Sequence, residues 1–262
     1  MNNFPKVSII MNCLNGEKFL RDSLKSVLNQ TYKNWELIFW DNLSIDNSKK
    51  ILKNFKEDRF KYFCSDTFLS LYKARNNAIQ KCAGEYIFFL DTDDTWVHDK
   101  IEKQVKFLQN NPDYKIVYSN YFLKDEIKNK TTKRSYNLLP YGFITKKLLN
   151  DYKLGILTVC LKRSIFEKFS FNDKYNVIGD FDFFINISLC EKIGCIQEPL
   201  AYYRIHNDNY SSTHAELHIK ELNNWLKNNN FLKTDYNFSL LKQTFYVFKL
   251  RVKYFFKQKK FI

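Results

Sequence analysis

The most informative segment of this 262-residue sequence is Gly84-Glu85-Tyr86-Ile87-Phe88-Phe89-Leu90-Asp91-Thr92-Asp93-Asp94. Its apolar run predicts a buried strand, and three carboxylates follow that strand at once. Because like charges repel, a bound cation is the natural way to stabilise them. Hard carboxylate oxygens suit Mg²⁺ or Mn²⁺, with substrate phosphates completing the coordination shell. The alternative is that the acids only cap a helix predicted over residues 99–110.

Strand and helix patterns alternate around this segment. Apolar runs predict strands at residues 7–11, 35–40 and 60–63, and helical spacing predicts helices at residues 19–30 and 71–82. The alternation is typical of an α/β, Rossmann-like fold, with a mainly parallel central sheet flanked by helices. Ligands of such sheets bind beyond the carboxyl ends of the strands. Here those ends are Asn12 to Asn15, Asp41 and Asp91.

The chain is basic, and much of the excess charge lies near its C-terminal end. There are 42 Lys and Arg against 28 Asp and Glu, a formal net charge of +14. Residues 201–262 hold 11 basic and 4 acidic residues, a net +7, and no acid follows Asp235. Basic excess favours a nucleic-acid or anionic-membrane partner. The nearly neutral first hundred residues offer no extended groove, so we expect no nucleic-acid partner.

Composition excludes several classes of protein. The six glycines form neither the G-x-G-x-x-G fingerprint nor a phosphate loop, so any nucleotide must be held by other means. The six cysteines contain no C-x-x-C pair and are expected to be reduced thiols. No apolar run approaches the ~20 residues of a spanning helix, and the start lacks a signal-peptide core. These features predict a cytoplasmic protein, with peripheral contact to the inner face of the plasma membrane as an option.

The C-terminal segment, residues 216–262, is predicted to be a helical, basic and aromatic tail after a domain of residues 1–215. Apolar residues recur there at helical spacing, at Leu241, Phe245, Phe248, Val252 and Phe255, with lysines on a neighbouring face. This pattern is typical of a helix in an anionic membrane interface, and we predict contact through residues 240–262. The alternative is that the stripe packs on the domain and the lysines are only solvated.

A polar segment and three isolated histidines carry no motif. Residues 124–137 are lysine-rich and poorly patterned, so we expect an exposed or mobile loop that contributes to substrate choice. His98, His214 and His218 have no acidic cluster beside them, and we expect surface or packing roles.

Several further blocks stand in a fixed order along the chain. They are Val7–Asn15, Leu24–Tyr32, Trp35–Asp46, Ala74–Ile79, Gly179–Asp182 and Tyr203–His206. Together with Gly84–Asp94, these blocks resemble the family 2 glycosyltransferases of the GT-A fold over roughly residues 5–212. The resemblance implies a nucleotide-binding half of about residues 1–98 and an acceptor half of about residues 99–215. It also implies an inverting transfer from a nucleotide sugar, by default a UDP-sugar, to a saccharide or lipid-linked saccharide in surface polysaccharide or glycolipid assembly.

The resemblance also implies roles for individual residues. Asp180 aligns with the general base, but Asp182 stays open because Gly179 stands where Glu is more usual. Asp41 resembles the reader of the nucleoside base, although Met11–Asn15 departs from the usual Pro-Thr-Tyr-Asn and puts the details of base recognition in doubt. The candidates are Asp180 as base; Asn12, Asn15, Asp41, Arg75, Asp91 and Asp93 for the nucleotide sugar; Asp91, Asp93 and His206 for Mn²⁺ or Mg²⁺; and Asp94, Asp182 and Arg204 as accessory residues.

Elementary chemistry agrees with such a site. Displacement at an anomeric carbon needs a base on the acceptor hydroxyl and charge neutralisation on the departing diphosphate. An Asp with a pKa near ~4 is ionised at neutral pH and can take the proton, and a cation can neutralise the diphosphate. The simpler interpretation of Asp180 is a helix cap.

Two other functions remain open from the sequence. The chain could be a catalytically silent nucleotide-sugar-binding partner of another transferase, because a fold does not guarantee turnover. It could instead bind nucleic acid through its tail, with aromatic residues among lysines.

Overall fold

The structure is a computed structural model that describes residues 4–259, without the side chains of residues 211, 212 and 253–259. Nine strands in this range form one sheet, in the order β3-β2-β1-β4-β8-β6-β9-β5, and β7 pairs with β6. The strands are β1 (Val7–Cys13), β2 (Trp35–Asp41), β3 (Phe60–Cys64), β4 (Tyr86–Phe89), β5 (Thr95–Trp96), β6 (Ile116–Asp125), β7 (Lys130–Lys133), β8 (Cys160–Lys162) and β9 (Ile193–Ile205).

The first four strands are parallel, as the alternating pattern predicts. β1 lies between β2 and β4, with Cys13 opposite Asp41 and Ile10 opposite Phe89. β1, β2 and β4 are buried apart from Asn12, because both faces of this part of the sheet are covered. Their carboxyl ends therefore lie along one edge of the sheet. The predicted α/β fold with a mainly parallel sheet is confirmed.

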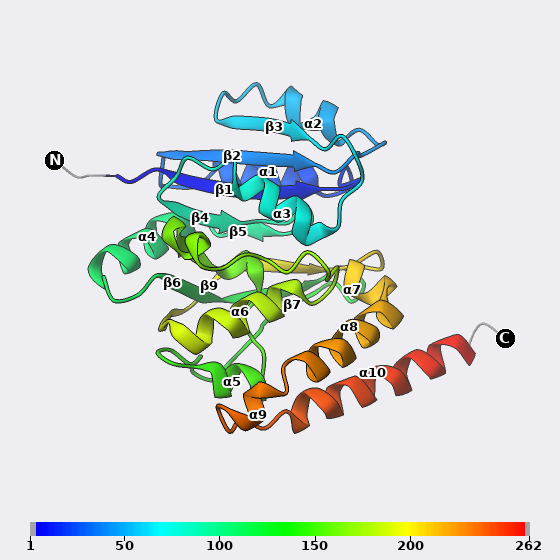
Figure 1. The fold of residues 1–262 in the computed structure, drawn as a ribbon. Helices are drawn as coiled ribbons and strands as arrows, with labels where there is room; N and C mark the ends of the chain where they lie inside the picture. The colour runs from blue at the N-terminus through cyan, green and yellow to red at the C-terminus, as the bar shows by residue number, and fades with distance from the viewer. Residues whose placement is uncertain (1–3, 260–262) are drawn as a thin grey trace.

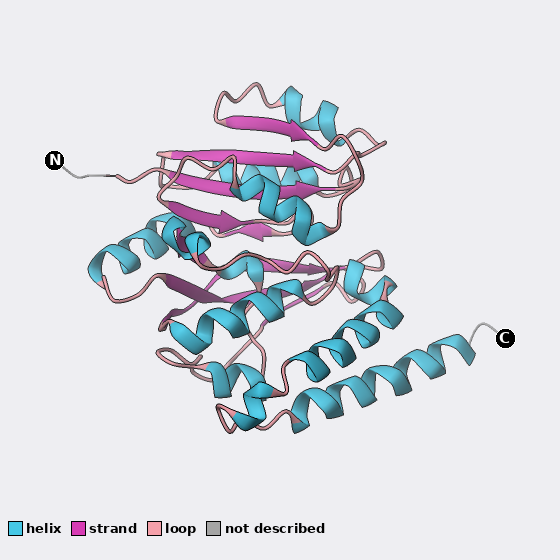
Figure 2. Ribbon diagram, in the orientation of Figure 1, coloured by secondary structure: helices cyan, strands magenta, loops and turns pink. Residues whose placement is uncertain are grey.

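Helices cover both faces of the sheet (Figures 1 and 2). One core cluster includes residues of α1 (Leu20–Leu28), α2 (Ser48–Asn54) and α4 (Lys100–Asn110). The other includes residues of α3 (Leu71–Ile79), α5 (Thr145–Asn150), α6 (Gly179–Cys190), α8 (Ala215–Asn228) and α10 (Leu241–Lys259). The remaining short helices are η1 (Ile156–Thr158), η2 (Arg163–Glu167), α7 (Tyr210–Thr213) and α9 (Phe231–Thr234). The two clusters hold the strand ends between layers of helices.

The second half of the sheet is mixed. β8 pairs antiparallel with β4 and β6, whereas β6 and β9 are parallel to each other. The expectation of a loop over residues 124–137 is wrong at residues 124–125 and 130–133, where β6 ends and β7 pairs with it. Asn129 adopts a left-handed conformation in the turn between these strands, with φ of 47°. Lysine-rich polarity hid the strands, because a hairpin at a sheet edge needs little apolar pattern.

The C-terminal helices continue the core across the predicted boundary at residue 215. Trp225 of α8 is fully buried, and Val247 of α10 belongs to the same cluster as the interior residues of α6. α8 and α10 lie side by side (Figure 1). The predicted apolar stripe lies on another face of α10, where Leu241, Phe245, Phe248 and Val252 are 38–77% exposed. The side chain of its last member, Phe255, and residues 260–262 lie outside the described residues. Among the described helices, none is both long and apolar enough to cross a membrane.

A buried lysine in α4 gives the fold a pH dependence. Lys100 is fully buried, and its Nζ donates to Gln104 and lies 5.2 Å from the ring centres of Phe88 and Trp96. Burial lowers the pKa of Lys100 to about 7 from 10.5. Between these values the unfolded chain keeps a proton that the folded chain has lost, so this residue makes the protein more stable as pH rises from 7 towards 10.5.

We therefore expect Lys100→Met to raise the free energy of unfolding at pH 7. Each pKa unit corresponds to ~1.4 kcal/mol, but Gln104 loses a partner, so we expect a gain of about 1–3 kcal/mol. Urea denaturation at pH 7 and pH 9 measures it, and the gain should shrink at pH 9. An equal or larger gain at pH 9 would contradict the proposed origin.

Candidate active site

Two loops at the carboxyl edge of the sheet are tied together by hydrogen bonds. The N–H of Asn15 donates to Ser44 Oγ (2.9 Å), and Asn15 Oδ1 accepts from the N–H of Ile45 (2.9 Å). Asn15 has a φ of 53°, a left-handed conformation that asparagine tolerates better than most residues. The loop after β1 is thereby fixed against the loop after β2.

Asp41 and Asn12 both lie at this edge, but they differ in their hydrogen bonding. Asp41 is 2% exposed, and its carboxylate accepts from the N–H of Ser44 and the hydroxyl of Tyr62, both at 2.8 Å. Asn12 keeps its side-chain nitrogen and oxygen buried, with no hydrogen-bond partner among the residues described. A buried amide without partners is costly, so Asn12 is the group at this edge that a ligand would satisfy.

Asp91, directly beyond β4, is anchored by an arginine of α3. Arg75 Nη2 lies 2.7 Å from Asp91 Oδ1. The Arg75 side chain is 3% exposed, whereas that of Asp91 is 36% exposed. Because the arginine is buried and the carboxylate is partly open, the pair holds Asp91 in place while leaving it accessible.

Asp93 is held by a histidine from the end of β9. His206 Nε2 lies 3.0 Å from Asp93 Oδ2, and the N–H of Asp208 donates to His206 Nδ1 (3.2 Å). With Nδ1 accepting, Nε2 carries the proton and donates to Asp93. In this arrangement His206 orients the carboxylate, and binding a cation through Nε2 would require the ring to exchange these bonds.

Asp94 and Arg204 join the acidic turn to β9. Asp94 is 2% exposed and accepts from the N–H of Arg204 (2.8 Å), while Arg204 Nε donates to the backbone oxygen of Asp93 (2.8 Å). The guanidinium of Arg204 also pairs with Glu126 and Asp22. These two accessory candidates therefore fix the shape of the turn that presents Asp91 and Asp93.

The acidic turn is electrostatically unfavourable by itself. Burial raises the pKa of Asp93, and the nearby Asp91 raises it further. Burial also holds the pKa of Asp94 well above its usual range, with Asp93 and Asp91 adding to the effect. A positive charge beside Asp91 and Asp93 would relieve this repulsion.

Asp180 lies at the start of α6 and is positioned by α3. The Tyr72 hydroxyl lies 3.2 Å from Asp180 Oδ1, which also accepts from the N–H of Phe181 (2.8 Å). A Cβ on Gly179 would stand 2.4 Å from the Tyr72 ring, so only glycine allows this approach. Burial raises the pKa of Asp180, and Arg75 partly offsets the increase.

Asp182 serves a different purpose. It is 7% exposed, and its Oδ1 accepts from the indole N–H of Trp225 (2.9 Å). This bond links α6 to α8 inside the core. Asp180 lines the large cavity of the molecule, whereas Asp182 does not.

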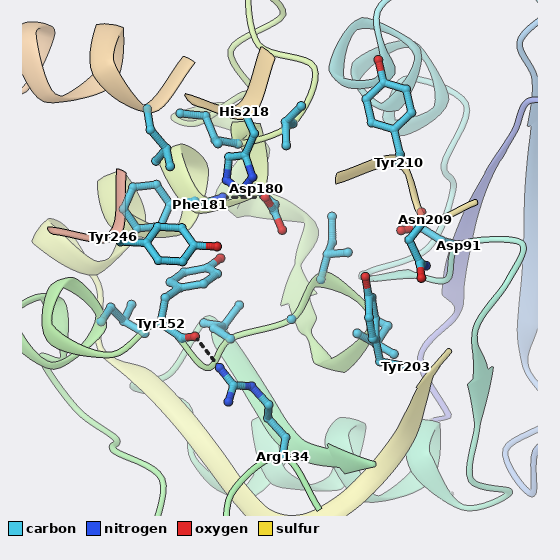
Figure 3. A pocket seen from close by; sticks show the side chains of 18 of the residues that line it. Asp91, Arg134, Tyr152, Asp180, Phe181, Tyr203, Asn209, Tyr210, His218 and Tyr246 are labelled. Carbon is cyan, nitrogen blue, oxygen red and sulfur yellow. Dashed lines mark hydrogen bonds between the residues drawn. The ribbon is translucent and has the colours of Figure 1, made fainter. Parts of the chain in front are cut away.

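A cavity of about 960 Å³ brings part of the predicted site together. In Figure 3, Asp91 lies at one side and Tyr246 at the other, with Asp180 between them. Of the predicted residues, the cavity is lined by Arg75, Asp91, Asp93, Asp94 and Asp180. Asn12, Asn15, Asp41, Asp182, Arg204 and His206 are not part of its lining. The acidic turn and the start of α6 therefore face one shared space.

The sequence of this chain also matches a known protein family. Residues 8–174 match the sequence pattern described as Glycosyl transferase family 2. The chain belongs to this family. The predicted family membership is thus confirmed, and the match includes Asn12, Asp41, Asp91 and Asp93.

Two relatives of this chain, both from Escherichia coli, carry the same description, UDP-Glc:alpha-D-GlcNAc-diphosphoundecaprenol beta-1,3-glucosyltransferase. WfgD is 36% identical over 165 residues, which span 63% of either chain. WfaP is 30% identical over 219 residues, 83% of this chain and 84% of WfaP. Among solved structures, S. aureus TarS 1-349 in complex with UDP-GlcNAc has a TM-score of 0.64 at 15% identity, covering 84% of this chain and 66% of that one. At that identity the likeness supports the GT-A fold alone.

The side chains of this site can supply part of the coordination shell of a divalent cation. Among the described side chains, no three His, Cys, Asp or Glu are grouped as a complete metal site. Asp91 and Asp93 nevertheless supply two carboxylates beside the cavity. Mg²⁺ and Mn²⁺ are commonly held by one or two protein carboxylates together with substrate phosphates. The observed pair of carboxylates suits that mode of binding.

Sequence reasoning missed several residues that line the cavity of this family 2 protein. His218, expected in a surface or packing role, packs against Tyr246 with ring centres 6.0 Å apart, and it also lines the cavity. Tyr152 also lines it, and its hydroxyl is buried without a hydrogen-bond partner in the described structure. Arg134, which directly follows β7, donates to the backbone oxygen of Tyr152 (3.2 Å). In the sequence, the hydrophobic spacing of residues 241–255 was the only sign that α10 contributes to the cavity wall.

Proposed function

We propose that this protein transfers a sugar, with inversion, from a nucleotide sugar to a saccharide acceptor. The observation that carries the proposal is the shared cavity, which places Asp180 opposite an acidic turn that suits a cation and a diphosphate. UDP-glucose is our default donor because the relatives WfgD and WfaP are described as UDP-Glc transferases. The same descriptions name a lipid-linked acceptor, and we propose a lipid-linked saccharide here.

At the donor end, Asp91 and Asp93 would hold Mn²⁺ or Mg²⁺ against the diphosphate. When bound, the cation supplies Lewis-acid stabilisation of the leaving group. The chain's own residues do the rest: Arg75 fixes Asp91, and His206 fixes Asp93. The unpartnered amide of Asn12, with Asn15 and Asp41 at the same edge, is proposed to bind the nucleoside.

At the acceptor end, Asp180 is proposed as the general base. Its carboxylate would take the proton of the attacking hydroxyl as the bond to the anomeric carbon forms and the bond to the nucleoside diphosphate breaks. The Tyr72 hydroxyl and the Phe181 N–H orient it. The position of Asp182, bonded to Trp225 away from the cavity, supports Asp180 as the base and Asp182 as a structural residue.

A panel of nucleotide sugars tests the proposal. Thermal shift with Mn²⁺ present reports donor affinity, because a ligand that binds the folded state raises the melting temperature. We expect stabilisation by UDP-sugars that is lost with EDTA, and transfer to a lipid-linked saccharide. Stabilisation without transfer or hydrolysis would favour a catalytically silent partner. Absence of nucleotide binding would contradict the proposal.

We further propose peripheral contact with an anionic membrane on its cytoplasmic side, through residues 240–262. The exposed stripe on α10 stands beside exposed Lys242, Lys249 and Arg251. Aromatic and basic side chains on one helix are typical of interfacial binding. Leu240 and Val247 are buried, so deleting this segment would disturb the core, and point substitutions give the clearer test.

We expect the double variant Leu241→Ser/Phe248→Ser to co-sediment poorly with anionic liposomes. Each side chain is more than half exposed, so folding should be preserved while each lost apolar contact weakens membrane binding roughly tenfold. The matched control is Tyr136→Ser/Leu138→Ser, which removes two side chains that are 80% and 86% exposed in the loop between β7 and α5. Wild-type sedimentation of the α10 variant would refute the membrane role.

A further inference from the structure

The cavity continues past Asp180 to the C-terminal helix. α10 contributes Lys242, Gln243, Phe245, Tyr246 and Lys249 to its lining. In Figure 3, Tyr246 lies on the far side of Asp180 from Asp91. A sugar acceptor that presents its hydroxyl to Asp180 and the donor therefore has its remaining part directed towards α10.

The α10 end of the cavity is positively charged. Lys242 and Lys249 are both exposed and both line it, and no acidic residue follows Asp235 in the chain. Lys249 Nζ lies 4.6 Å from the ring centre of Phe245. Facing α10, His218 of α8 adds an aromatic group to the lining. Asp151, an acid after α5 that also lines the cavity, pairs with Lys153 (2.9 Å). A neutral saccharide gives two such lysines no oppositely charged partner, whereas a phosphate group does.

An apolar surface begins at the same place. Phe245 lines the cavity and is 57% exposed, and Leu241 and Phe248 on the same helix are 77% and 59% exposed. Asp180, the two lysines and Phe245 thus line one cavity, and the exposed apolar stripe of α10 adjoins it. This combination matches a molecule built from a saccharide, a phosphate linkage and a hydrocarbon chain.

We propose that Lys242 and Lys249 bind the phosphate linkage of a lipid-linked saccharide acceptor, while the apolar stripe of α10 accompanies its hydrocarbon chain. This inference deepens the proposed function and rests on it for the direction of the acceptor. α10 is then a wall of the acceptor site as well as a membrane contact. The two lysines distinguish phosphate-linked acceptors from neutral glycolipids.

Binding of geranyl diphosphate, a soluble isoprenyl diphosphate without a sugar, tests the proposal independently of donor and sugar identity. Calorimetry is carried out on the full chain without vesicles and with EDTA present, so that no cation recruits the diphosphate to Asp91 and Asp93. We expect Lys242→Gln/Lys249→Gln to weaken this binding roughly 10- to 100-fold, because each charged hydrogen bond lost costs about tenfold. Binding of decyl maltoside, which has no phosphate, should not change.

The matched control is Lys227→Gln/Lys233→Gln, which removes two exposed cations of α8 and α9 outside the cavity lining. It should bind geranyl diphosphate like the wild type. Equal losses in both double variants would overturn the proposal, because they would show a diffuse charge effect, and so would a wild type that does not bind the diphosphate. UDP binding with Mn²⁺, measured on the same samples, reports on the proposed function separately and confirms that each variant is folded.

Discussion

Asp180→Asn should abolish sugar transfer while sparing nucleotide binding. The substitution keeps the size and the contact with Tyr72 but removes the group that accepts the proton, and positioned bases contribute about 10²–10⁴-fold to rates. We expect kcat to fall by that factor, with the UDP dissociation constant in Mn²⁺ unchanged. Single-turnover transfer and calorimetry measure the two quantities.

Asp182→Asn is the matched control for this result. It alters a carboxylate two residues away that lies outside the cavity lining, and it keeps an oxygen that can accept the bond from Trp225, so the kcat of the folded protein should not change. Transfer at the wild-type rate by Asp180→Asn would refute the base assignment.

Because burial raises the pKa of Asp180 above 3.8, the base becomes protonated at a higher pH than an ordinary Asp. Wild-type kcat should therefore fall on the acid side as pH drops through this raised pKa.

Asp93→Ala should remove metal-dependent nucleotide binding. The change takes away one of two cavity carboxylates proposed to hold the cation against the diphosphate, and perturbed metal sites typically lose 10- to 100-fold in affinity. We expect UDP affinity in Mn²⁺ to fall by at least roughly tenfold, to the level seen with EDTA. Calorimetry with and without Mn²⁺ measures this, and transfer should be lost in parallel.

His206→Gln distinguishes two roles for His206, orienting Asp93 and binding the cation. Glutamine can still donate a hydrogen bond to Asp93, so UDP affinity in Mn²⁺ should be retained if His206 only orients that carboxylate. Loss as large as in Asp93→Ala would instead assign His206 to the cation. A response to Mn²⁺ that survives in Asp93→Ala would contradict the metal role of Asp93.

The sequence predicted the parts of the fold and site that depend on local pattern. Apolar runs located the parallel strands, and acids at their ends located Asp41, Asp91 and Asp93 at one edge of the sheet. Asp180 required family resemblance, because nothing in its local sequence distinguishes a base from a helix cap. Its position relative to Asp91 depends on packing between α3 and α6, which no short window contains.

Other features depend on contacts between distant segments. The close approach of Tyr72 to Gly179 explains why glycine precedes Asp180, and it joins residues far apart in the chain. The part of the cavity lined by His218 and α10 depends on the packing of α8 against α6 and of α10 against α8 and α5. The hairpin after β6 was missed because its strands are polar and short.

Helix α3 links the two ends of the chemistry. Tyr72 touches Asp180 and Arg75 touches Asp91, and these two side chains are three residues apart, on one face of the same helix. One turn of helix therefore links the position of Asp91, proposed to hold the cation of the donor, to that of Asp180, the proposed base. A substitution that unwinds this turn should displace both carboxylates together.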